Sequence, residues 1–148
     1  MEFPHVEALI PHEGDMVLLD EVVEWSEDEV HCRRTIREGA HFVENGRMPA
    51  TVGLEFMAQS IAAYAGCLGH LDGEPVKLAF LLSCRNLELF TGSFEVGDVL
   101  DIFAIPVFIG DSALGSFDCR VERDGQRVAA AQLNVYQGSL DSVMQRVS

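Results

Sequence analysis

The chain has 148 residues, of which 48% are hydrophobic, so it is long enough for one domain with a substantial core and is not typical of a disordered protein. Its 24 acidic and 10 basic residues give a net charge of −14, which argues against binding to nucleic acid or to an anionic membrane surface. The acidic N-terminus lacks the apolar stretch of a signal peptide, so we expect a cytoplasmic, single-domain protein over residues 1–148.

The first half of the chain predicts a pair of strands followed by one long helix. Pro49 suits the first helical turn, and the apolar residues that follow recur at helical spacing but also occupy the other faces, so we expect this helix to be buried nearly all round. The predicted elements are an N-terminal segment over 1–10 with a helical turn over 4–10, strands over 17–25 and 29–36, a loop over 37–48 and a helix over roughly 51–68.

The second half predicts strands, with a loose tail over 138–148. Asp124-Gly125 is typical of a two-residue type I′ hairpin turn, and Pro106 indicates a bulge or a sheet edge. The predicted strands cover 76–84, 87–90, 98–109, 113–122 and 128–136.

Few folds accommodate an apolar helix together with about six antiparallel strands, because a sheet must curl around the helix and a second copy or another layer must cover the rest. We therefore expect an α+β hotdog fold, with the antiparallel sheet wrapped around one long buried helix, in a dimer. Small residues within the helix favour close packing over room for a long ligand; these are Ala62, Ala63 and Gly66.

Glu55 is the only charged residue between Met48 and Gly69. This stretch is long enough to span a bilayer, but its polar residues and the lack of a flanking basic cluster favour a buried helix and no membrane span. An ionised group taken out of water must be paired or neutralised. Either Glu55 reaches the surface as one polar spot, or it is kept in a dry site to move protons.

His41 lies in the loop before the helix, 14 positions before Glu55. A loop histidine is commonly a solvated surface group. Here the helix start at Ala50 and Thr51 adds free backbone N–H groups, which suit developing negative charge on oxygen. A base, an acid and an oxyanion site are the parts needed to remove a proton next to a carbonyl. Gln59, at i+4 from Glu55, either holds the carboxyl or is a buried amide bound by backbone.

The four cysteines form no CxxC pair, so we expect reduced core thiols and no metal site. His31 and Cys32 are adjacent on a predicted strand, where neighbouring side chains point to opposite faces and cannot easily converge on one ion.

The segment HFVENGRMPATVGLEFMAQ resembles the signature of the hotdog 3-hydroxyacyl-[acyl-carrier-protein] dehydratases of bacterial fatty acid synthesis. Those read His-Phe, a short turn, Met-Pro-Gly, then Glu and Met-Ala-Gln, with the same spacing from His to the acid. The upstream IPHEGDMVLLDEV and the later Val96-Gly97-Asp98 also resemble the family. Val43-Glu44 stands in place of Pro-Gly and Ala50 in place of Gly, which is more similar to a branch associated with aryl polyene and related lipid clusters.

The resemblance implies a mechanism without metal or cofactor. His41 would remove a proton from C2 of a 3-hydroxyacyl thioester, and Glu55 would protonate the departing C3 hydroxyl. The N–H of Ala50, helped by Thr51, would polarise the thioester carbonyl. In the family His and the acid come from different chains of a dimer, and the acyl group arrives on the phosphopantetheine arm of an acyl carrier protein and lies in a tunnel beside the helix.

An acidic carrier protein would need a local basic patch on this acidic chain. Arg47 and Arg85 are the candidates, with Arg33, Arg34 and Arg37 behind them, and each could equally be a solvated surface charge. Two alternatives keep the fold: a hotdog acyl thioesterase, which would not need His41, and a non-catalytic partner subunit of a dehydratase. The partner of this chain would be a second copy or another hotdog chain.

Overall fold

The structure is a computed structural model, and it describes residues 3–12, 14–71, 73, 78–110 and 114–138. The helices are α1 (Val6–Leu9) and α2 (Gly53–Leu71), with 3-10 turns η1 (Gly14–Met16) and η2 (Ala50–Val52). The strands are β1 (Glu21–Ser26), β2 (Glu29–Thr35), β3 (Arg47–Pro49), β4 (Leu78–Leu89), β5 (Ser93–Glu95), β6 (Val99–Ile109), β7 (Leu114–Arg123) and β8 (Gln126–Gly138).

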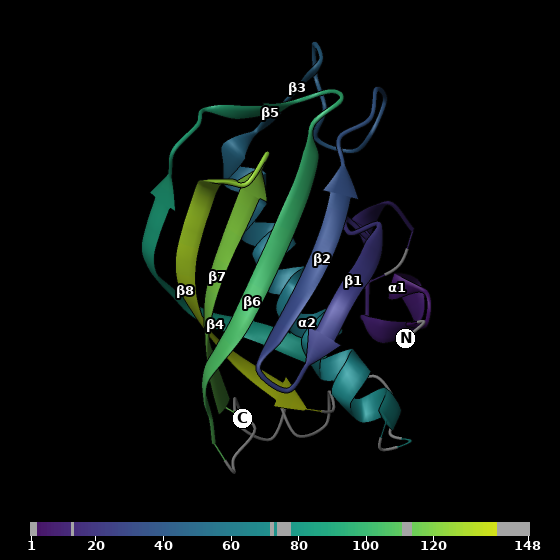
Figure 1. Cartoon of the computed structure of the whole chain (residues 1–148), viewed down its shortest axis with the longest axis vertical. Coiled ribbons are helices and arrows are strands. Elements are labelled where there is room, and N and C mark those ends of the chain that lie inside the picture. Colours follow the sequence, from purple (N-terminus) through teal and green to yellow (C-terminus); the bar gives the residue numbers. More distant parts are fainter. Residues whose placement is uncertain (1–2, 13, 72, 74–77, 111–113, 139–148) are drawn as a thin grey trace, which may run out of the picture.

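In the part of the chain that the structure describes, one antiparallel sheet has the strand order β1-β2-β6-β7-β8-β4, and β3 and β5 form a separate two-stranded ribbon. The sheet curls around α2, which lies across its concave face (Figure 1). Strand residues that face the helix are buried and their neighbours are not, as in the pattern of β6. The predicted α+β hotdog fold is confirmed.

The core forms where α2 meets the sheet. Phe56, Met57 and Ile61 are fully buried on the helix. Gly66 packs so closely against α1 that an added Cβ would lie 2.0 Å from the carbonyl oxygen of Leu9. Close packing is therefore present at Gly66, but its partner is the N-terminal helix α1 and not a strand, as had been expected. None of the described helices is long and apolar enough to cross a membrane.

The predictions for the Asp124-Gly125 turn, for Pro106 and for the N-terminal helical turn are confirmed. Asp124 and Gly125 have φ of 54° and 76° between β7 and β8, as a type I′ turn requires. The β6–β7 register shifts between Pro106 and Phe108, as expected for a proline inside a strand. The predicted helical turn over 4–10 is confirmed as α1.

Three strand predictions need correction. β1 begins at Glu21 instead of residue 17, because the N–H of Val17 binds the Gly14 carbonyl and that of Leu18 binds the side chain of Gln59. The two strands predicted over 76–84 and 87–90 are one strand, β4, which continues through an irregularity at Asn86, where φ is 55°. The ribbon of β3 and β5 was not predicted. Residues 76–77 and 139–148, which include most of the predicted tail, lie outside the described residues, whereas Gly138 belongs to β8.

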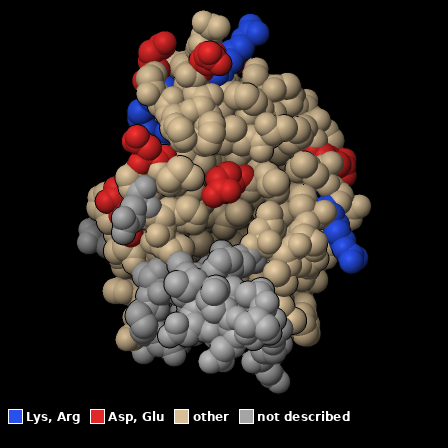
Figure 2. All heavy atoms as spheres, turned by 180° about the vertical axis from the view of Figure 1, so that it is seen from behind, with Lys and Arg blue, Asp and Glu red and all other residues tan. Residues whose placement is uncertain are grey.

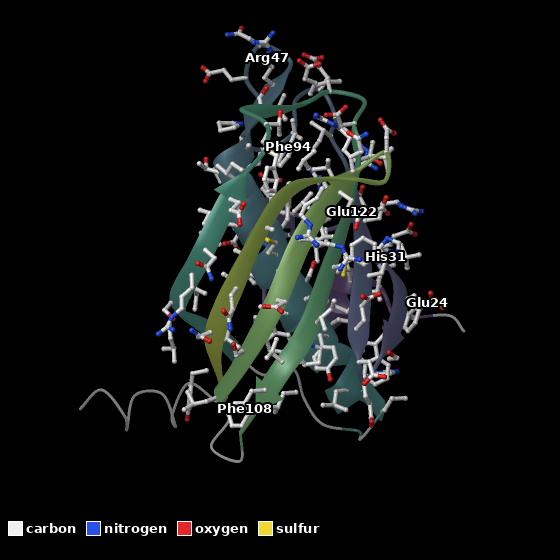
Figure 3. All side chains as sticks on the ribbon, turned by 60° about the vertical axis from the view of Figure 1, so that its left-hand side comes forward. Glu24, His31, Arg47, Phe94, Phe108 and Glu122 are labelled. Carbon is white, nitrogen blue, oxygen red and sulfur yellow. The ribbon has the colours of Figure 1, made fainter. Side chains whose placement is uncertain are left out.

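The edge strand β4 exposes a row of apolar side chains. Leu82 is 59% exposed and Phe90, just after the strand, is 56% exposed. Phe108, near the end of β6, also projects from the sheet in Figure 3. The exposed apolar residues on or next to β4 are Leu81, Leu82, Leu87, Leu89 and Phe90. A separate exposed group on β6, which β7 and β8 separate from β4, consists of Val107, Phe108 and Ile109. Within the described residues β4 has a neighbour on one side only, so its other side offers free backbone groups.

Candidate active site

The start of α2 is held by the small ribbon of β3 and β5. Met48 and Phe94 pair across this ribbon and are both fully buried. The ring of Phe94 lies against Gly53, where an added Cβ would be 3.4 Å from it, and 6.0 Å from the ring centre of Phe56. The ribbon therefore fixes the position of the first helical turns, including that of Glu55.

Glu55 lies in the first turn of α2, and its side chain is 42% exposed. It belongs to a helical stripe that the sheet leaves partly uncovered, together with Ala58 and Ala65. The dry environment expected for this carboxyl is thus not formed by one chain alone. The physical reason is that the sheet strands that the structure describes do not cover this stripe, so the Glu55 side chain remains accessible to water.

Gln59 ties Glu55 to the segment that precedes β1. Its Nε2 donates to Oε1 of Glu55 at 3.3 Å and to the Met16 carbonyl at 2.6 Å, while its Oε1 accepts the N–H of Leu18 at 2.9 Å. The amide is fully buried. Both interpretations of Gln59 therefore hold, since it contacts the carboxyl and is also bound by backbone groups.

His12 is the histidine that contacts Glu55 within the chain. Its Nε2 lies 3.5 Å from Oε1 of Glu55, and its side chain is 26% exposed. His12 is not among the site residues predicted from the sequence. The available signal was the Pro11-His12 dipeptide of the family-like upstream motif, but nothing in the spacing indicated that it would meet a residue 43 positions later.

His41 lies in the exposed loop between β2 and β3. Its ring is 4.0 Å from the ring of Phe42, which is exposed and has φ of 70°. A positive φ is uncommon for a bulky residue, and such strain is found most often at functional sites. In the described residues of one chain, no interaction joins His41 to Glu55. One protomer therefore does not assemble the pair.

A polar hollow of about 400 Å³ opens beside His41. It is also lined by Asp15, Gly39 and Arg34, whose guanidinium is mostly buried and lies 3.4 Å from Asp20. Burial lowers the pKa of Arg34, against the opposing effect of Asp20. Its Nε has no hydrogen-bond partner within the described part of the chain.

The backbone at the helix start is only partly free. The N–H of Ala50 donates to the Gly92 carbonyl at 3.1 Å, and this bond occupies the group that the resemblance assigned to the substrate carbonyl. Thr51 is exposed in the first turn, where N–H groups have no acceptor within the helix. Thr51 is thus the better placed of the two donors.

The arginines predicted for carrier docking lie on different elements. Arg47 projects from β3 at one end of the molecule (Figure 3) and is 3.8 Å from Glu95. Arg85 is exposed on β4 and has no ion-pair partner among the residues that the structure describes. Arg33, Arg34 and Arg37 lie 3.1, 3.4 and 3.0 Å from acidic groups, closer than Arg47 lies to Glu95, so Arg47 and Arg85 are the less tightly paired cations.

The cysteines and the small hollow beside α2 offer no further chemistry. Cys32, Cys67 and Cys119 are buried free thiols and Cys84 is half-buried, so three of the four lie in the core as expected. Burial raises the pKa of Cys32 to about 12 and that of Cys67 to about 11. No cluster of metal-ligating residues occurs in the described ranges. The apolar hollow next to Tyr64 and Leu68 is only about 60 Å³.

Comparisons with known proteins concern the family and the fold of the chain. A search of the curated proteins found no match. A chain of the dehydratase heterocomplex ApeI:P from Xenorhabdus doucetiae has a TM-score of 0.93 and 29% identity, over 99% of this chain and 99% of that chain. A hypothetical thioesterase with coenzyme A from Streptococcus pneumoniae TIGR4 has a TM-score of 0.62 and 14% identity, over 80% of this chain and 85% of that chain, which shows the fold alone.

The model of the ApeP-like family, described as ApeP dehydratase, matches residues 4–145. The match spans the helix start, both candidate site residues and the whole sheet. The chain belongs to the ApeP-like dehydratase family.

Proposed function

We propose that this chain supplies His41 and Glu55 to the dehydration of a 3-hydroxyacyl thioester, giving a trans-2-enoyl thioester and water. The observation that supports the proposal is that the family match spans both residues, while His41, in the loop between β2 and β3, and Glu55, in the first turn of α2, do not meet within one chain. In the proposed assembly, His41 of one chain faces Glu55 of another across a shared site.

The chemistry consists of two proton transfers, one from C2 and one to the oxygen of the hydroxyl on C3. Neutral His41 takes the proton from C2, and the electron pair of that C–H bond forms the new C2–C3 double bond. The C3–O bond breaks as the protonated Glu55 gives its proton to the hydroxyl, which leaves as water. The N–H of Thr51 donates to the thioester carbonyl, where negative charge develops. Exchange with solvent returns the proton from His41 to Glu55, and no cofactor is required.

A second hotdog chain is the partner that the surface features favour. The β4 edge is apolar and unpaired on one side, and edges of this kind add another strand. On the side of α2, charged side chains lie mainly around the margin of the described surface (Figure 2), although the chain carries a net charge of −14. Pairing through this region would cover the stripe that contains Glu55. We propose a second copy of the chain as the partner, with a different hotdog chain as the alternative.

The proposed substrate is carried by an acyl carrier protein in the cytoplasm. Arg47 and Arg85 are the proposed contacts for the acidic carrier. A reducing compartment matches the four free cysteines.

Incubation of the pure chain with a 3-hydroxyacyl thioester tests the proposal. We expect the enoyl thioester as the product, with its thioester bond intact. Release of free thiol that persists in His41→Ala would identify a thioesterase instead. No reaction by the chain alone, together with activation of another hotdog dehydratase on mixing, would identify a non-catalytic partner subunit.

A further inference from the structure

The imidazole of His12 reaches Glu55 from the segment between α1 and η1. Its Nε2 is 3.5 Å from Oε1 of Glu55, and the same oxygen accepts the Nε2–H of Gln59 at 3.3 Å. We propose that His12 is a positioning residue: it holds Oε1 of Glu55, so that Oε2 carries the proton delivered to the substrate. This inference rests on the proposed function, in which Glu55 is the acid.

The protonation state of His12 follows from its other nitrogen. Nδ1 is buried and has no hydrogen-bond partner in the described part of the chain. An imidazolium, or a neutral ring protonated on Nδ1, would place an N–H there without an acceptor, which is costly in a buried position. The tautomer protonated on Nε2 avoids that cost and makes His12 a neutral donor to Oε1.

A neutral donor suits an acid, whereas a cation would not. A positive charge beside Glu55 would favour the carboxylate and prevent it from holding a proton. Glu55 is the only charged group in ion-pair range of His12 among the described residues. Because Oε1 accepts the N–H of Gln59 and lies 3.5 Å from Nε2 of His12, the proton of the neutral acid belongs on Oε2, for which no hydrogen bond within the described residues is found.

The segment that carries His12 is itself fixed to α2. Gln59 binds the Met16 carbonyl and the Leu18 N–H, so the backbone just after His12 is tied to the same helix turn that presents Glu55. His12 and Gln59 therefore form one support for the carboxyl.

The test compares His12→Ala and His12→Gln with wild type in the active assembly, with His31→Ala as the control. His31 also contacts a carboxylate but lies on the sheet face away from α2. For His12→Ala we expect kcat to fall roughly ten-fold with KM within two-fold, because the contact that orients the reacting carboxyl is lost. The basic limb of the pH–rate profile moves to higher pH, since an N–H beside the carboxyl favours its ionised form. His12→Gln, which keeps an N–H donor, recovers part of kcat.

Wild-type kcat and an unshifted profile in His12→Ala would overturn the proposal. Equal losses in His12→Ala and His12→Gln, with an unshifted profile and lower thermal stability, would show a packing role and would also overturn it.

A second measurement separates this inference from the proposed function. If wild type does not dehydrate the thioester, or if Glu55→Gln stays active, the proposed function fails, and nitrogen NMR of the histidine rings still reports on the contact. A neutral His12 protonated on Nε2, whose signals shift in Glu55→Gln, supports the positioning geometry. A ring protonated on Nδ1 or charged at neutral pH overturns it.

Discussion

Two histidine–carboxylate pairs in this molecule have different surroundings. On the sheet face away from α2, His31 lies 2.7 Å from Asp101, Arg33 binds the same carboxylate oxygen, and the His31 ring stacks on Phe103. At the start of α2, His12 lies 3.5 Å from Glu55, whose other contact is the neutral amide of Gln59. One oxygen of Asp101 is thus bound by both a histidine and an arginine, whereas Glu55 keeps one oxygen without a hydrogen bond within the described residues. The same residue types therefore build a structural pair in one place and a candidate acid in the other.

Replacing each carboxylate by its amide gives the largest expected contrast. Glu55→Gln keeps the shape but removes the transferable proton, so dehydration should fall about 10²–10⁴-fold. Asp101→Asn should leave kcat within two-fold and lower the free energy of unfolding by about 1 kcal/mol, because it weakens the contacts with His31 and Arg33. Steady-state kinetics and urea denaturation of both variants measure the two effects. Comparable activity losses in both would remove the distinction between the pairs.

Introducing charge on the β4 edge tests whether the activity attributed to Glu55 requires a partner chain. Leu82→Lys combined with Leu87→Lys places charge on the exposed edge without disturbing the core of a single chain. We expect the assembly to dissociate into folded monomers, with activity reduced more than about ten-fold, as expected when a catalytic group is lost from the site. Light scattering, circular dichroism and kinetics report the outcome. Val99→Lys, at an exposed aliphatic position of β6, is the control. An active, folded monomer would contradict the dependence on a partner.

Sequence patterns predicted the features that depend on neighbours in the chain. The periodicity of α2 and the turn at Asp124-Gly125 were correct because each arises within a few residues. The contact between His12 and Glu55 and the continuity of β4 were missed because both depend on packing between distant segments. The dry environment of Glu55 was expected from its apolar neighbours in sequence, but helical geometry places the carboxyl on a stripe that the sheet of the same chain does not cover.

The arginines also differ in how closely acidic groups lie to them. Reversing Arg47 and Arg85 to Glu should lower kcat/KM for a carrier-bound substrate roughly three- to ten-fold while sparing a small thioester, because rim charges chiefly affect association. Arg127→Glu is the matched control, since Arg127 is exposed and has no ion pair within the described residues. Equal losses on both substrates would indicate damage to the site and not to docking.

The opposite face of β2, the strand that carries His31, gives the smallest of the predicted effects, which is an effect on stability. Cys32 points into the core, and burial raises the pKa of its thiol to about 12, although a hydrogen bond with Ser60 acts in the opposite direction. Unfolded thiols titrate near ~8.5, so above that pH the unfolded chain releases a proton that the folded chain retains, and stability falls as pH rises. We expect Cys32 to account for about 1–2 kcal/mol of the loss by pH 10. Urea denaturation at pH 7.5 and pH 10 should show a weaker pH dependence in Cys32→Ala than in Cys84→Ala, and an equal dependence in both would refute the assignment.

Mixing two inactive variants tests the shared site most directly. His41→Ala and Glu55→Gln, refolded together, should form mixed dimers in which one site carries both lesions and the other carries none. If the two copies associate randomly, about half of the molecules are mixed and each has one intact site, so roughly a quarter of wild-type activity should return. Each variant refolded alone should stay inactive. Mixed dimers that are demonstrated by mass spectrometry and yet show no activity would contradict a site built from His41 of one chain and Glu55 of the other.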